Sequence, residues 1–127
     1  QFKPVNDAFG HDAGDGLLVE VARRMRATLR EEDSLARLGG DEFAAIIVNV
    51  PDAVTLDILL SRLLTVIAEP VWVANHSVEV SASMGYTLYP QGEEIDGDQL
   101  LRQADQAMYR AKREGKNRYY CFQDADA

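Results

Sequence analysis

The chain has 127 residues, a length that suits one compact domain over residues 1–127, and its 46% hydrophobic and 27% charged residues are typical of a globular protein. The formal net charge of −8 argues against a general affinity for DNA or RNA, but it leaves nucleotide binding open, since a nucleotide needs only a few local cations or a metal. No apolar run approaches the roughly 20 residues that span a bilayer, and the one cysteine, Cys121, excludes an internal disulfide, which fits a cytoplasmic location.

Three helices are predicted from apolar residues that recur at helical spacing. The first covers about residues 13–30. The second begins after Asp52, which can cap its first turn, and ends before Pro70. The third covers about residues 99–114, and Gly115 suits the C′ position that follows a helix.

Strands are predicted between and after these helices. Apolar runs at residues 35–38 and 43–48 flank a Gly-Gly pair, which favours a hairpin because tight hairpin turns need positive φ. Further strands are expected at residues 71–73, 78–80, 83–89 and 117–122. Helices and strands alternate only in part, which favours an α+β sandwich with helices packed on a mostly antiparallel sheet.

The segment Gly-Gly-Asp-Glu-Phe at residues 39–43 carries the clearest chemical signal. Two carboxylates beside a turn of glycines can hold a hard divalent cation while a nucleotide phosphate approaches the backbone closely. Such a cation neutralises charge during phosphoryl transfer. A hairpin turn with merely exposed acids explains the same residues, so the segment alone leaves both interpretations open.

Five segments, in order, resemble the GGDEF family. They are Phe-Lys-x-x-Asn-Asp at 2–7, Gly-His-x-x-Gly-Asp at 10–15, Arg-Leu-Gly-Gly-Asp-Glu-Phe at 37–43, Ser-x-Gly at 83–85, and a last helix with its turn at 104–118. The resemblance covers essentially the whole chain. It implies a palm-like βααββαβ core similar to class III nucleotide cyclases, and an activity that joins two GTP molecules into cyclic di-GMP with release of two pyrophosphates.

The resemblance assigns roles at the signature one position at a time. Asp41 would be a ligand of Mg²⁺ or Mn²⁺ and would help to deprotonate the attacking 3′-hydroxyl. Glu42 would support the metal or the substrate. Gly39 and Gly40 would let the backbone approach the α- and β-phosphates. Lys3 would steady phosphate charge during transfer, although by itself it reads as a solvated surface lysine.

Four further residues match the family's GTP-binding positions. Asn6 and Asp15 match the pair that reads guanine, where an amide serves donor and acceptor edges and a carboxylate accepts from N1–H and N2–H₂. A helix-start cap for Asn6 and dipole pairing for Asp15 explain them equally well. Lys112 and Lys116 match cationic positions for the terminal phosphates. Lys112 also suits a helix C-terminus, where a cation is favourable. Lys116 stands where the family often has arginine, so a single ammonium would replace a side chain that binds phosphate through two donors.

An Arg-x-x-Asp pair, Arg30 and Asp33, precedes the signature at the spacing of the family's inhibitory product site. Arginine suits that role because its fork pairs with phosphate and its plane stacks on guanine. Arg62 is expected to be a secondary contact. Without the resemblance, the pair would read as a solvated helix end. Product bound there would give feedback by holding two active sites apart.

Catalysis in this family needs two GTP-loaded domains face to face, so the resemblance implies a homodimer controlled by an upstream sensory domain, with a phosphodiesterase domain as another possible neighbour. The family also has a strand immediately before Phe2 whose first aspartate completes the metal site, so we expect the 127-residue chain itself to make little or no cyclic di-GMP. The alternative is a non-catalytic module that binds GTP or cyclic di-GMP to regulate an attached phosphodiesterase or other partner. Trp72 and the tyrosines are expected to pack, and neither His11 nor His76 has a metal-binding partner at ligand spacing.

Overall fold

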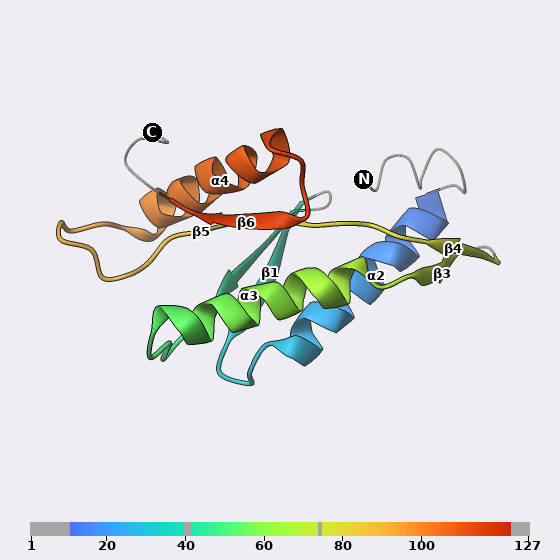
Figure 1. Cartoon of the computed structure of the whole chain (residues 1–127), viewed down its shortest axis with the longest axis horizontal. Helices are drawn as coiled ribbons and strands as arrows, with labels where there is room; N and C mark the ends of the chain where they lie inside the picture. Colours follow the sequence, from blue (N-terminus) through green and yellow to red (C-terminus); the bar gives the residue numbers. More distant parts are fainter. Residues whose placement is uncertain (1–10, 40–41, 74, 123–127) are drawn as a thin grey trace. The chain divides into compact units, whose positions relative to one another are not determined.

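The computed structural model describes residues 11–39, 42–73 and 75–122 of the chain (Figure 1). Two compact units are present, the first ending at Val80 and the second beginning at Ser81. The described strands pair two by two: β1–β2 and β3–β4 are antiparallel in the first unit, and β5–β6 is parallel in the second. The α+β class is as predicted, and two of the three strand pairs are antiparallel.

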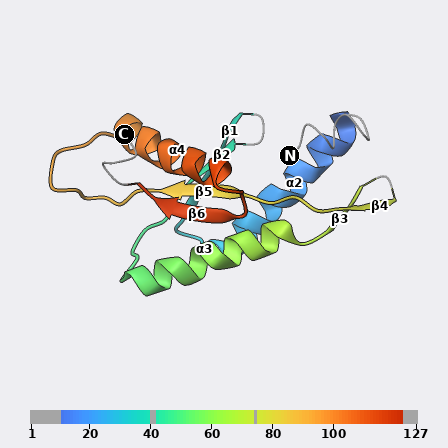
Figure 2. The same cartoon turned by 45° about the horizontal axis from the view of Figure 1, so that its top comes forward.

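The first unit is built on two helices, α2 (His11–Thr28) and α3 (Ala53–Ala68), which lie side by side (Figures 1 and 2). As predicted, Asp52 caps α3, since its carboxylate accepts a hydrogen bond from the N–H of Thr55 at 2.7 Å. No helix in the described residues is long and apolar enough to cross a membrane. The buried side chains of the two helices and of Leu29, which directly follows α2, are these: Leu17, Val21, Met25, Leu29, Leu56, Leu60, Leu63 and Ile67.

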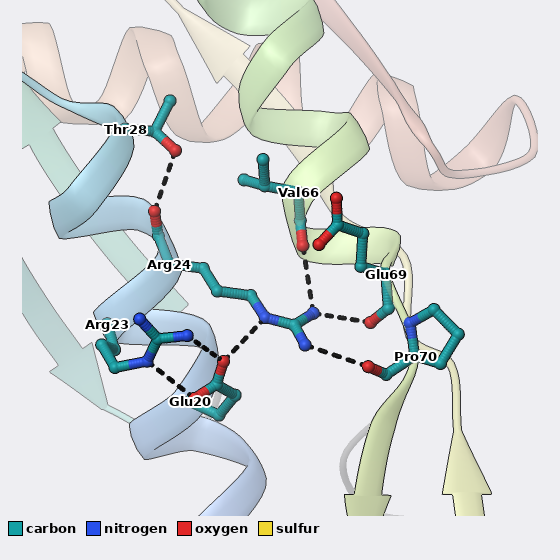
Figure 3. Close-up of polar contacts among 7 residues, drawn as sticks. All are labelled: Glu20, Arg23, Arg24, Thr28, Val66, Glu69 and Pro70. Atoms are coloured by element: carbon teal, nitrogen blue, oxygen red, sulfur yellow. Dashed lines mark hydrogen bonds and ion pairs between the residues drawn. The ribbon is translucent and has the colours of Figure 1, made fainter.

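A polar cluster around Arg24 also joins these two helices (Figure 3). The Nε of Arg24 donates to the carboxylate of Glu20 at 2.8 Å. Its two Nη atoms donate to the carbonyls of Val66, Glu69 and Pro70 at 3.1, 2.6 and 3.0 Å. Because the last carbonyls of a helix lack partners within it, Arg24 satisfies the C-terminal end of α3 from a neighbouring helix.

The predicted hairpin around the Gly-Gly pair consists of β1 (Ser34–Gly39) and β2 (Glu42–Ile46), with Gly39 opposite Glu42. The register shifts between Arg37 and Gly39, which marks an irregularity before the turn. Gly39 has a φ of 152°, a backbone conformation that side chains rarely allow. The glycine at this position is therefore required by the turn.

The second hairpin differs from its prediction by two residues. Its strands are β3 (Val71–Val73) and β4 (His76–Val78), so His76 lies in a strand and the expected strand at 78–80 begins too late. Asn75 provides the turn with a φ of 67°, a conformation that asparagine tolerates. Of the Asn-His pair, Asn75 has the positive φ of a turn residue, whereas His76 already pairs with Val73, so β4 begins two residues earlier than predicted.

The second unit contains β5 (Ser83–Tyr86), α4 (Gly97–Arg113) and β6 (Arg118–Cys121), and α4 packs along both strands (Figure 2). The predicted strand at 83–89 is thus three residues too long. A Cβ added to Gly85 would lie 2.1 Å from the backbone of α4, so β5 approaches this helix as closely as only glycine allows. The Ser-x-Gly motif therefore has a packing role in this unit.

The end of α4 confirms the prediction for Gly115, which has a φ of 119°. The N–H of Lys116 donates to the carbonyl of Ala111 at 3.0 Å, the long bond of a Schellman motif. At the other end, Asp96 and Gln99 form a reciprocal capping box. Both ends of the helix are therefore fixed by residues close in sequence.

The aromatic residues do not all pack as predicted. Tyr86 and Tyr119 lie with their ring centroids 6.3 Å apart, and the guanidinium of Arg110 lies 4.1 Å from the ring centroid of Tyr120. Trp72, in contrast, is 75% exposed. Since side chains of a strand alternate between faces, burial of Val73 turns Trp72 outward, and the prediction that it packs was wrong.

Candidate functional site

A pocket of about 370 Å³ lies between α2 and the β1–β2 hairpin. This volume falls in the range of about 300–1,000 Å³ that small-molecule sites occupy. Two of its lining residues, Asp15 and Arg37, are ionisable, and the others are apolar. The lining consists of Asp15, Leu18, Val19, Ala22, Leu35, Arg37 and Phe43.

This pocket brings together two regions that the sequence analysis assigned to GTP. Asp15, the expected guanine reader, lies exposed on α2. Arg37 and Phe43, within the signature, face the same pocket from β1 and β2. A carboxylate acceptor and a guanidinium thus border one largely apolar space, a combination suited to a nucleotide, whose planar base offers hydrogen-bond donors and whose phosphates are negatively charged.

The structure describes the turn between β1 and β2 at its two ends. Gly39 is the last residue of β1, and Glu42 is the first residue of β2, where its side chain is exposed. Gly40 and Asp41, the other expected phosphate and metal residues of the turn, lie outside the described residues. The same holds for two expected residues near the start of the chain, Lys3 and Asn6.

A divalent cation is compatible with the donor chemistry of the signature. Glu42 offers an exposed carboxylate, and hard cations such as Mg²⁺ prefer oxygen ligands. In the part of the chain that the structure describes, no three His, Cys, Asp or Glu side chains gather as a metal site. Asp41, the expected ligand, lies outside that part, so its role as a ligand stays a prediction.

The two expected phosphate-binding lysines belong to the second unit, where both are exposed. Lys112 lies in the last turn of α4, together with Arg110 and Arg113, so three cations complement the carbonyl end of this helix. Lys116 follows in the Schellman turn with a φ of 61°. The backbone fixes where its side chain begins and leaves the ammonium exposed.

The Arg30–Asp33 turn is the most completely defined candidate site in the described residues. Asp33 is only 3% exposed, so the interpretation of this pair as a solvated helix end is wrong. Its carboxylate accepts hydrogen bonds from the N–H groups of Arg30 and Val48 at 2.9 and 3.0 Å. It also accepts from the Nε and Nη2 of Arg30 at 3.2 and 3.3 Å.

These contacts decide the charge of Asp33. Burial favours the neutral acid, but the hydrogen bonds from the Arg30 side chain and from two backbone N–H groups outweigh it and hold the pKa of Asp33 below its ordinary value. The guanidinium of Arg30, whose side chain is 42% exposed, also lies 3.3 Å from Glu32 and donates to the carbonyl of Val48. The Nε and Nη2 atoms of Arg30 are therefore bonded to neighbouring groups, while part of its side chain faces solvent.

Arg62, the expected secondary contact, lies exposed on α3. Among the described residues, no hydrogen bond or ion pair joins Arg62 to Arg30 or Asp33. Sequence reasoning missed Arg26, whose guanidinium donates to the carbonyls of both Arg30 and Asp33. Its position one helical turn before Arg30 was the available signal.

Comparison with known proteins gives the family. The model of the diguanylate cyclase GGDEF domain matches residues 1–118. The bifunctional diguanylate cyclase/cyclic di-GMP phosphodiesterase MucR of Pseudomonas aeruginosa is 46% identical over 126 residues, which cover 98% of this chain and 18% of MucR. The chain therefore spans less than a fifth of the length of this relative.

Solved structures agree with the sequence comparison. A form of TpbB from Pseudomonas aeruginosa that comprises only its GGDEF domain has a TM-score of 0.90 at 35% identity, covering 98% of this chain and 73% of that one. The GGDEF domain of DgcB from Caulobacter crescentus, in complex with c-di-GMP, has a TM-score of 0.83 at 28% identity, covering 94% and 71%. This chain belongs to the GGDEF family of diguanylate cyclase domains.

Proposed function

We propose that this chain is the catalytic domain of a diguanylate cyclase that condenses two GTP molecules into cyclic di-GMP and two pyrophosphates. The observation that carries the proposal is the pocket between α2 and the β1–β2 hairpin. Asp15 borders it on the helix and the signature strands border it on the hairpin. The proposed guanine acceptor and the strands that flank the proposed phosphate-binding turn therefore line the same pocket.

The reaction needs a base reader, a phosphate cradle and a proton acceptor. Asp15, with Asn6, would hold the guanine edge, while Gly39 and Gly40 let the backbone approach the phosphates. Each 3′-oxygen forms a bond to the α-phosphorus of the other GTP, and the bond from that phosphorus to the β-phosphate oxygen breaks, releasing pyrophosphate. The hydroxyl proton would pass to the carboxylate of Asp41.

Charge on the transferred phosphates must be balanced throughout. Lys3 would contribute one cation near the reacting group, and Lys112 and Lys116 would contribute two for the terminal phosphates. Asp41, supported by Glu42, would hold Mg²⁺ or Mn²⁺, which neutralises phosphate charge when bound. Each GTP supplies both a nucleophile and an electrophile, and the two GTP-loaded domains would face each other in a homodimer, as the family resemblance implies.

The proposal includes product feedback at the Arg30–Asp33 turn. Arg30 is oriented by a buried, ionised Asp33 and keeps part of its side chain in solvent, where its fork suits a phosphate and its plane suits a guanine. Arg62 would be a secondary contact. The similar DgcB domain was solved with c-di-GMP bound, which supports this ligand class for the family.

The test measures the cyclic di-GMP formed from GTP and Mg²⁺ by the parent protein that carries this domain, and by its Asp41→Asn and Asp15→Asn variants. Asp15→Asn replaces one of two acceptor oxygens with an NH₂ donor, which cannot accept from the second guanine N–H group, so KM for GTP should rise at least about tenfold. Asp57→Asn, an exposed change on α3, is the matched control and should leave KM unchanged. Full activity of Asp41→Asn would refute the catalytic assignment.

The second candidate function is a non-catalytic module that binds GTP or cyclic di-GMP and regulates a phosphodiesterase or another partner. NbdA of Pseudomonas aeruginosa favours it, because this relative is 37% identical over 122 residues of the chain and is named only as a cyclic di-GMP phosphodiesterase. An intact protein that binds GTP without turnover, but changes the rate of a phosphodiesterase when it does so, would support this alternative over the first.

A further inference from the structure

The turn that carries Arg30 and Asp33 is closed by backbone contacts at the end of α2. The N–H of Leu29 donates to the carbonyl of Met25 at 3.0 Å, and the N–H of Asp33 donates to the carbonyl of Arg30, also at 3.0 Å. The turn therefore begins where the helix ends, and its two outer residues, Arg30 and Asp33, are hydrogen-bonded to each other through the backbone.

Arg26, in the last turn of α2, holds both ends of this turn from outside. Its Nη1 donates to the carbonyl of Asp33 at 2.7 Å, and its Nη2 donates to the carbonyl of Arg30. The planar fork of arginine can bond two acceptors at once, whereas a lysine ammonium is a single point charge on a flexible stem. Two hydrogen bonds from one side chain are thus an arrangement that suits arginine better than lysine.

These two hydrogen bonds of Arg26 bear on the orientation of the Arg30 side chain. The side chain of Arg30 is oriented by the carboxylate of Asp33, and the carboxylate is placed by the backbone of the turn. Arg26 fixes that backbone at both carbonyls, and both of these hydrogen bonds end on the backbone of the turn. Its effect on binding would therefore be transmitted through the turn.

We propose that Arg26 is a positioning residue for the binding of cyclic di-GMP, which keeps the Arg30–Asp33 turn in the conformation that presents Arg30 to the phosphates and guanines of the product. The inference rests on the proposed product feedback. It adds a residue outside the Arg-x-x-Asp pair and states how that residue acts: it restrains the turn, and touches neither the product nor GTP.

The test compares Arg26→Met and Arg26→Lys in the intact protein, with Arg23→Met as the matched control. Arg23 lies on the same helix, pairs with Glu20 and is 66% exposed, so its loss removes a cation without touching the turn. Calorimetric titration with cyclic di-GMP should show Kd raised about tenfold or more in both Arg26 variants, which corresponds to about 1.4 kcal/mol, and unchanged in Arg23→Met. KM for GTP should stay at the wild-type value.

Melting temperatures of all variants separate positioning from general destabilisation, because a lower melting temperature alone does not change Kd when the protein stays folded at the assay temperature. Wild-type Kd in Arg26→Met, with binding lost in Arg30→Ala, would overturn the role of Arg26 and leave the product site standing. Wild-type Kd in Arg26→Lys with a raised Kd in Arg26→Met would overturn the fork mechanism in favour of charge alone. Wild-type binding by Arg30→Ala would reject the product site itself.

Discussion

Replacing Arg24 with methionine tests how the first unit holds its two helices together. Methionine keeps a long apolar stem and removes only the guanidinium, so the packing around the side chain changes little. The substitution deletes the donors to Val66, Glu69 and Pro70 at the end of α3, together with the donor to Glu20 (Figure 3).

The size of the effect depends on whether water can replace Arg24. Its side chain is only 13% exposed, so the hydrogen bonds are partly shielded from solvent. Hydrogen bonds to charged groups contribute about 1.5–3 kcal/mol each, but Glu69 and Pro70 are exposed, and water can satisfy their carbonyls after the change. We therefore expect the free energy of unfolding to fall by about 3 kcal/mol, a large share of the roughly 5–15 kcal/mol that stabilises a typical protein.

Urea unfolding followed by circular dichroism measures this loss, with Arg23→Met as the matched control. Both arginines bind the same Glu20 carboxylate, but the Arg23 side chain is exposed and forms no hydrogen bond or ion pair with α3 among the described residues. Its replacement should leave the urea midpoint unchanged. Equal losses in the two variants would show that the ion pairs with Glu20 matter and that the capping of α3 does not.

Three further predictions concern stability and pH. Gly85→Ala should destabilise the second unit by about 3 kcal/mol or more, because the added Cβ would lie 2.1 Å from backbone atoms of α4. The control variant Gly92→Ala should melt like the wild type, because no atom lies within 4 Å of its added Cβ. Equal melting temperatures of the two variants would contradict the close approach of β5 to α4. Hydrogen bonds from Arg23 and Arg24 lower the pKa of Glu20 from 4.5 to about 2, so its stabilising contribution is complete above pH 4.5 and is lost as the pH falls through 2. The difference in melting temperature between the wild type and Glu20→Gln should shrink over that interval, and a constant difference would refute the assignment. Asp33→Asn removes the ionised acceptor of two backbone N–H groups, and thermal unfolding should show a melting temperature several degrees lower than that of the wild type.

The helices were predictable because their signals are local. Apolar periodicity placed all three within a few residues of their observed bounds, and the caps at Asp52 and Gly115 act as predicted. Each of these signals depends on residues within one or two helical turns. The physical determinants of a helix lie in its own sequence, apart from the surface against which it packs.

Strand partners and long-range caps were not predictable in the same way. The parallel pairing of β5 with β6 joins strands separated by α4, and Arg24 binds carbonyls 42 to 46 positions further along the chain. Neither has a local pattern, since any arginine on a helix reads as a surface cation. The error at Trp72 has a related cause, because a three-residue strand is too short for its pattern to show which face is buried.

The sequence indicated which candidate residues lie near each other better than it indicated how buried each of them is. The structure places Asp15 and the hairpin strands of the signature on one pocket, which follows from their places on α2, β1 and β2. The resemblance also marked Arg30 and Asp33 as a pair, but it treats them as equal partners. Their surroundings differ, because Asp33 is buried and Arg30 is partly exposed.

That difference determines which variant can test product binding. The carboxylate of Asp33 serves the fold as well as the site, since it accepts from the N–H of Val48 across the unit. A loss of binding in an Asp33 variant would therefore mix a lost contact with a disturbed turn. In Arg30→Ala, the carboxylate keeps two backbone donors, the N–H groups of residue 30 and Val48, so its buried charge stays satisfied. Loss of cyclic di-GMP binding by Arg30→Ala at an unchanged melting temperature would then report on the product contact itself.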